Sequence, residues 1–140
     1  MSVTLRHIGI ATDKINESIE FYSKFFNFTI VNDNHESGNF INTILGKKCE
    51  VRTVKMTNGD FMIEFLHFNS FQNSKFNIFT LGCTHFALTV SDVDNIFSRL
   101  SLENVEFISK PKLSDTKCAK VCFLKDPNNN IFIELVEEII

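Results

Sequence analysis

Apolar and polar residues alternate around a histidine at two places in the chain, and a helical pattern follows each of them. Residues 5–30 resemble residues 83–108, so that His7 aligns with His85 at a constant offset of 78 positions. The alternation predicts a strand at each histidine, and apolar residues that recur every three or four positions after it predict a helix. We therefore interpret the chain as two copies of one unit.

A pair of strand-like runs joined by a turn closes each copy. Both connecting segments, Thr57–Asp60 and Lys125–Asn129, contain Asn together with Gly or Pro, and these residues favour tight turns. Because an extended segment also follows each predicted helix, the repeated unit is predicted to be βαβββ. The extended segments are 27–32 and 104–109, and the paired runs are 50–56 with 61–68 and 117–124 with 130–137.

The repeat predicts an α+β domain built from two βαβββ modules. We expect one domain over residues 1–140, with module 1 at about 3–68, module 2 at about 83–137 and a linker at 69–82. A second irregular segment, 38–48, interrupts module 1. Irregular segments commonly carry binding residues, so these two are expected to frame a substrate.

The charge of the chain argues against nucleic acid as a partner. Its 14 Lys and Arg residues are scattered among 17 Asp and Glu residues, the net charge is −3, and the longest basic run is Lys47-Lys48. A phosphate backbone is normally met by a basic patch. No apolar window reaches the roughly 18 residues of a membrane span, and the first residues do not resemble a targeting segment. We expect no membrane partner and a cytoplasmic location.

Phenylalanine is unusually frequent, at 16 of 140 residues. We favour dense core packing as its role, and an aromatic-lined ligand pocket is the alternative. The four cysteines have no spacing suited to zinc and are expected to be free thiols, since a chain of this length can bury a core without disulfides. They are Cys49, Cys83, Cys118 and Cys122.

Each copy ends in a strand that carries one glutamate among apolar residues, Glu64 in the first copy and Glu134 in the second. A carboxylate in such a place must be paired, hydrogen-bonded or bound to a cation. The repeat supplies two pairs, His7 with Glu64 and His85 with Glu134. If the modules pack symmetrically around a cup, the two imidazoles and two carboxylates can converge on a divalent cation, whose charge the carboxylates neutralise.

The remaining histidines are expected to lie outside such a site. His67 follows Glu64 by three residues, so its side chain points to the opposite face of a strand. His35 lies in a polar segment that is expected to be a solvated loop.

Six short segments have the pattern of a known family. They are His7–Ile10, Ser18–Tyr22, Ile63–Phe65, His85–Val90, Phe123–Asn128 and Ile133–Leu135. With them the chain resembles the vicinal oxygen chelate superfamily, which includes glyoxalase I, methylmalonyl-CoA epimerase, extradiol dioxygenases and the bleomycin and fosfomycin resistance proteins. The resemblance extends over nearly the whole chain. It implies that the paired modules form an open, cup-shaped mixed sheet, usually in a homodimer.

The resemblance also implies a metal site formed by His7, Glu64, His85 and Glu134. This ligand set is most similar to that of bacterial glyoxalase I, with a Ni, Co, Zn or Mn ion as the cofactor. The implied activity is that of a lyase or isomerase, which moves a proton on the carbon next to a carbonyl through a metal-chelated enediolate. By the same resemblance Glu134 is the catalytic base, with Glu64 as its symmetry-related counterpart.

Two departures from the family pattern bear on the substrate. Ala11 stands four positions after the first histidine, where glutathione-using glyoxalases have an arginine that holds the glutamyl carboxylate of the thiol, and this argues against glutathione. The segment characteristic of the epimerase before its last strand is not evident either. The expected small-molecule substrate is a hemithioacetal or an acyl-CoA. The alternatives are an epimerase-like isomerase, a non-catalytic ligand-binding or resistance protein of the same fold, and an iron-dependent dioxygenase.

Overall fold

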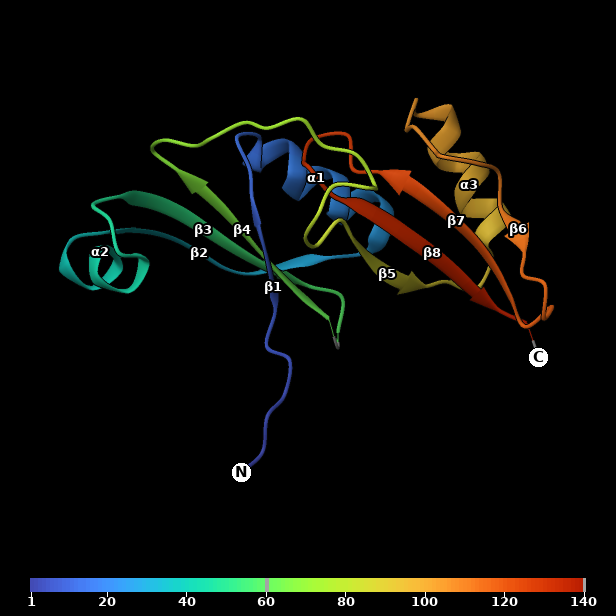
Figure 1. Cartoon of the computed structure of the whole chain (residues 1–140), viewed down its shortest axis with the longest axis horizontal. Helices are drawn as coiled ribbons and strands as arrows, with labels where there is room; N and C mark the ends of the chain where they lie inside the picture. The colour runs from blue at the N-terminus through green and yellow to red at the C-terminus, as the bar shows by residue number, and fades with distance from the viewer. Residues whose placement is uncertain (60, 140) are drawn as a thin grey trace. The chain divides into compact units, whose positions relative to one another are not determined.

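Each copy of the sequence repeat folds into a unit of its own. The computed structural model describes residues 1–59 and 61–139, and the chain divides into Met1–Asn73 and Ser74–Ile140 (Figure 1). The boundary between the units lies inside the predicted linker, 69–82. Asp60, the last residue of the predicted turn at Thr57–Asp60, lies outside the described residues.

The first unit is a four-stranded mixed sheet packed against a helix. Its strand order is β1-β4-β3-β2, in which β1 runs parallel to β4 and the other neighbours are antiparallel (Figure 1). Its elements are β1 (Ile8–Ala11), α1 (Ile15–Phe26), β2 (Thr29–Ser37), α2 (Asn39–Leu45), β3 (Glu50–Thr57) and β4 (Met62–Phe68).

The second unit repeats this topology. Its strand order is β5-β8-β7-β6, again with the first strand parallel to the last. The pairing is equivalent too, because Gly9 lies opposite Glu64 and Ala87 lies opposite Glu134. The predicted α+β fold of two related modules is thus confirmed. The elements are β5 (His85–Thr89), α3 (Val93–Leu102), β6 (Lys112–Leu113), β7 (Ala119–Lys125) and β8 (Phe132–Glu138).

Three segments differ from the sequence expectations. The irregular segment 38–48 contains the seven-residue helix α2, which is too short to show a clear periodic pattern. Strand β2 continues through Ser37 and includes His35, which was expected in a loop. As an edge strand it is exposed over most of both faces, so its sequence lacks the alternation that marks a half-buried strand. In the second unit the extended segment 104–109 forms no named strand among the described residues, and Phe107 makes an isolated bridge with Leu124.

Aromatic side chains fill the space between α1 and the sheet. Tyr22 of α1 is completely buried, and its ring centroid lies 5.3 Å from that of Phe65 and 5.6 Å from that of Phe28. On β4 the neighbours Ile63 and Phe65 are fully buried on this side. Since side chains alternate along a strand, Glu64 lies on the other side of the sheet. We call this side the Glu64 face. Its equivalent in the second unit is the Glu134 face.

The second unit has an aliphatic core in the same place. Helix α3 begins at the N-cap Asp92, whose side chain accepts a hydrogen bond from the Asn95 backbone N–H at 3.0 Å. Leu100 on the helix, with Ile133 and Leu135 on β8, is fully buried. In the described part of the chain, no helix is long and apolar enough to cross a membrane.

Candidate metal centre

The first predicted pair comes together where β1 lies beside β4. The Nε2 atom of His7 is 3.5 Å from Oε1 of Glu64, and the two side chains are only 25% and 17% exposed. The other ring nitrogen of His7, Nδ1, is buried and has no hydrogen-bond partner among the described residues. The parallel pairing of the first and last strands is therefore what brings a residue near the N-terminus against a glutamate 57 positions later.

The second predicted pair occupies the equivalent place in the other sheet. The Nε2 atom of His85 is 3.3 Å from Oε2 of Glu134, with side chains 42% and 23% exposed. The ring of Phe123, the cross-strand partner of Glu134, meets the imidazole edge-on with centroids 5.1 Å apart. The Phe123 ring therefore borders this pair on one side.

In the first unit a lysine occupies the position equivalent to Phe123. Lys55 is the cross-strand partner of Glu64, and its Nζ atom lies 3.9 Å from Glu64 Oε2. The next strand contributes Asn32 to the same row, and the Asn32 side-chain oxygen is buried without a partner among the described residues. Sequence reasoning missed both residues. The available signal was a lysine between two apolar residues in the middle of a predicted strand.

Both histidine–glutamate pairs have the chemistry and the spacing of metal ligands. Imidazole nitrogens and carboxylate oxygens suit first-row divalent ions. The separations of 3.3 and 3.5 Å exceed the usual length of an N–H···O hydrogen bond. Two ligand atoms that each lie about 2.1 Å from one ion are roughly 3.0 Å apart at a right angle and roughly 3.4 Å apart at the tetrahedral angle. Each pair therefore fits two of the ligands of a divalent metal ion.

Each unit supplies two of the four predicted ligands. Within residues 1–59 and 61–139, no group of three or more His, Cys, Asp or Glu side chains lies together in a way that could hold a metal ion. The structure thus joins His7 to Glu64 and His85 to Glu134, and the complete four-residue set stays a prediction.

The other two histidines of the first unit lie in a different row. His35, Arg52 and His67 are cross-strand neighbours on β2, β3 and β4, beside a cavity of about 220 Å³. Arg52 donates two hydrogen bonds to Asp33, at 3.0 and 2.8 Å, and this guanidinium lowers the pKa of the Asp33 carboxyl. His67 lies on the sheet side opposite Glu64, as the alternation predicts.

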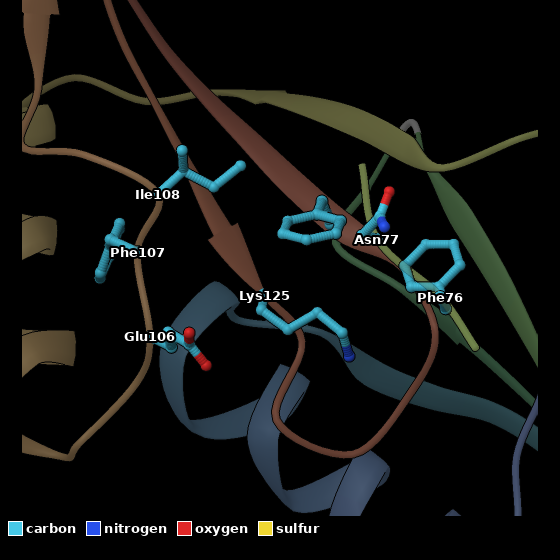
Figure 2. A pocket seen from close by; sticks show the side chains of 7 residues that line it. Phe76, Asn77, Glu106, Phe107, Ile108 and Lys125 are labelled. Atoms are coloured by element: carbon cyan, nitrogen blue, oxygen red, sulfur yellow. The ribbon is translucent and has the colours of Figure 1, made fainter. Parts of the chain in front are cut away.

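A partly aromatic cavity of about 290 Å³ opens in the second unit (Figure 2). Phe132 of β8 stacks on Phe76 with ring centroids 5.8 Å apart. Phe132 precedes Glu134 by two residues, so it lies on the Glu134 face. Figure 2 shows the Lys125 ammonium directed toward Phe76, and it also donates hydrogen bonds to the backbone oxygens of Asp126 and Asn129. Phe76 belongs to the segment 69–82, which was expected to frame a substrate.

The family model of the Glyoxalase/Bleomycin resistance protein/Dioxygenase superfamily matches residues 4–135. The chain belongs to this superfamily. The vicinal oxygen chelate resemblance predicted from the sequence is thereby confirmed. No curated protein matches the chain.

Several solved structures of the superfamily are similar to this chain. A glyoxalase family protein from Bacillus cereus superposes with a TM-score of 0.84 at 19% identity, over 99% of this chain and 96% of that one. The fosfomycin resistance protein FosX from Listeria monocytogenes, complexed with Mn(II) and sulfate, has a TM-score of 0.64 at 18% identity, over 100% and 96%. A glyoxalase I mutant from Zea mays has a TM-score of 0.66 at 16% identity, over 93% of this chain and 43% of that one. At these identities the similarity establishes the superfamily fold.

Proposed function

We propose that the protein is a divalent-metal-dependent lyase or isomerase of the glyoxalase I type. The observation that carries the proposal is the pair of structurally equivalent His–Glu contacts, one on each mixed sheet. The ion would be held by the two imidazoles and the two carboxylates of His7, Glu64, His85 and Glu134. Ni, Co, Zn and Mn are the candidate ions, and FosX provides a precedent for a divalent ion in this fold.

The metal ion, when bound, supplies a Lewis acid that stabilises negative charge on the oxygens of a substrate. The Glu134 carboxylate is the base that takes a proton from the carbon next to the carbonyl. With a hemithioacetal it returns this proton to the former carbonyl carbon, while the hydroxyl proton passes to the former carbonyl oxygen. With an acyl-CoA the proton returns to the opposite face of the same carbon. Glu64 is the counterpart on the other sheet. The histidines hold their ring nitrogens toward the carboxylates. Partial burial of His7, Glu64 and Glu134 limits water around those three side chains, whereas His85 is 42% exposed.

The proposed substrate is a small molecule of the hemithioacetal or acyl-CoA class. The bound ion would stabilise negative charge on the two adjacent oxygens of this substrate. We also propose a homodimer, as the family resemblance implies. The two pairs then converge either within one chain or across the two-fold interface. In the second case metal binding and dimerisation are linked, so that dilution and chelation each weaken the other.

Elemental analysis of protein purified without chelator or affinity tag tests the metal site. The native protein is expected to retain a near-stoichiometric divalent metal, which His7→Ala and the double variant Glu64→Ala with Glu134→Ala lose. His67→Ala is the matched control, because it removes an imidazole from the opposite side of the same sheet. A native protein that takes up no metal even after reloading contradicts the proposal.

Solvent exchange tests the chemistry in samples whose metal content has been determined, because Glu134 is also a proposed metal ligand. Hemithioacetals and acyl-CoA thioesters are incubated with loaded protein in deuterated water, and deuterium at the carbon next to the carbonyl is followed by NMR. Glu134→Gln is expected to remove the exchange, because the amide cannot accept the proton. If Glu134→Gln exchanges deuterium at the native rate, Glu134 is not the base.

The cavity beside Phe76 favours a second function, the binding of an apolar ligand without catalysis. Its aromatic lining is typical of sites that hold a flat apolar group. In that case Phe76→Ala weakens binding of a fluorescent apolar probe, whereas the double glutamate variant binds it as the native protein does. Dependence of probe binding on bound metal argues for the enzymatic function instead.

A further inference from the structure

Asn32, Lys55 and Glu64 form one polar row across three neighbouring strands. Asn32 of β2 lies opposite Lys55 of β3, and Lys55 lies opposite Glu64 of β4. Directly opposed residues of antiparallel strands have their side chains on one face, with Cβ atoms roughly 5 Å apart. We call these residues the Asn32 row. The row lies on the Glu64 face and ends beside the proposed metal ligand.

Lys55 is placed to interact with something besides Glu64. Its ammonium lies 3.9 Å from the nearer Glu64 oxygen, which is longer than a normal charge-assisted hydrogen bond. The Lys55 side chain is 24% exposed, so the group is reachable from solvent. Each oxygen of Glu64 has a different neighbour, since Oε1 faces His7 and Oε2 faces Lys55. If a metal ion bound Glu64, the ion and the Lys55 ammonium would both interact with the same carboxylate.

One atom of the neighbouring amide is unsatisfied among the described residues. The Asn32 side-chain oxygen is buried and accepts no hydrogen bond from the described residues. A buried acceptor without a donor is costly, and a ligand that carries a hydroxyl or amide proton removes that cost. The equivalent row of the second unit has Phe123 in the position of Lys55, so the two sheets differ in charge at this level.

We propose that the Asn32 row is a specificity site, in which Lys55 binds an anionic group of the substrate and Asn32 accepts a hydrogen bond from a hydroxyl next to it. This inference rests on the proposed function, because it places the anionic group beside the chelated oxygens. The charges of the proposed site support it. One dication, two carboxylates and two neutral imidazoles sum to zero, and Lys55 adds one positive charge. A carboxylate on the substrate would bring the sum back to zero, and a phosphate would more than offset the charge of Lys55.

The test compares three probes that share one hydroxyketone unit. Dihydroxyacetone is neutral, dihydroxyacetone phosphate carries a phosphate on one of the two hydroxyls, and hydroxypyruvate has a carboxylate in place of one hydroxymethyl group. Affinities are measured by calorimetry for the native protein and for Lys55→Met, Lys55→Arg and Lys24→Met. Lys24→Met is the matched control, since it removes one positive charge from α1, which packs on the opposite side of the sheet.

The native protein is expected to bind at least one anionic probe about tenfold more tightly than the neutral one, as one charge-assisted hydrogen bond provides. Lys55→Met is expected to lose that preference, with the affinity for dihydroxyacetone unchanged. Lys55→Arg and the control retain the preference. The anionic probe that Lys55→Met binds more weakly than the native protein does identifies the kind of anionic group that Lys55 binds. Equal affinity of native protein and Lys55→Met for both anions overturns the inference.

Metal content separates this outcome from failure of the proposed function. The metal in each sample is determined before the titration. A native protein that takes up no metal even after reloading contradicts the proposed function. In that case a preference for an anionic probe that Lys55→Met abolishes still supports an anion site at Lys55, and the absence of such a preference overturns it. Retained metal with no effect of Lys55→Met overturns the specificity site alone.

Discussion

Replacing Lys55 by Met should tighten metal binding at the proposed centre. The Lys55 ammonium and a metal ion compete for the same carboxylate, Glu64. At the observed 3.9 Å, two unit charges attract by roughly 1 kcal/mol in a water-like dielectric and by roughly 4 kcal/mol at an effective dielectric of 20. Both side chains are partly exposed, so we expect a value near the lower end. A difference of about 1.4 kcal/mol corresponds to a tenfold change in affinity.

A competition titration with a chromogenic zinc chelator measures this change. Methionine keeps the length and apolar character of the lysine stem, so packing on the Glu64 face is preserved. We expect Lys55→Met to bind Zn²⁺ about tenfold more tightly than the native protein, and the difference should shrink at high salt. Lys55→Arg keeps the charge and should behave like the native protein, as should Lys24→Met on the opposite side of the sheet.

The reasoning is refuted if Lys55→Met binds zinc as the native protein does, or more weakly, while its circular dichroism is unchanged. The same variant is expected to lose affinity for an anionic probe. A misfolded protein would lose affinity for both metal and anion, whereas removal of one positive charge moves the two affinities in opposite directions.

Four further predictions concern stability and reactivity. Burial raises the pKa of the Cys122 thiol to about 11, so iodoacetamide at pH 8 should modify Cys83 at least tenfold faster, as peptide mass spectrometry can show. An equal rate at both thiols would mean that Cys122 is accessible. Because the unfolded thiol ionises at lower pH, Cys122 should also lower stability as the pH rises from about 9 to 11, and Cys122→Ala should flatten that decline in chemical denaturation. Phe65→Ala should destabilise the protein by about 3–5 kcal/mol because it empties a fully buried site beside Tyr22, and a loss below about 1 kcal/mol would contradict the packing. Arg52 lowers the pKa of Asp33 in the folded protein. The ion pair therefore contributes its full stability above the pKa of the unfolded state, about 4, and this stability is lost as the pH falls through the lower pKa of the folded state. Asp33→Asn should remove that acid-side dependence, which is at most about 1 kcal/mol for so exposed a pair, and an unchanged acid profile would refute it.

Periodicity and repetition were sufficient to predict the fold of the two units. Strands that are buried on one side and helices with one apolar face leave a local signature, and the duplication places the signature twice. Comparing the copies also identified two pairs, His7 with Glu64 and His85 with Glu134. In the structure the two side chains within each pair lie no more than 3.5 Å apart. The elements that were missed, α2 and the outer part of β2, are short or exposed on both sides, and such segments have no periodic signature.

The sequence by itself determined the repeated βαβββ pattern, because the apolar positions that define it are local. Only the tertiary structure decided which polar side chains share a face. Asn32, Lys55 and Glu64 lie on separate strands, and their row depends on strand register and on the bulge between Ile30 and Asn32. A shift of one residue in that register would turn Lys55 to the opposite side of the sheet. The placement of the Lys55 charge beside Glu64 therefore depends on strand pairing, which a local sequence pattern does not specify.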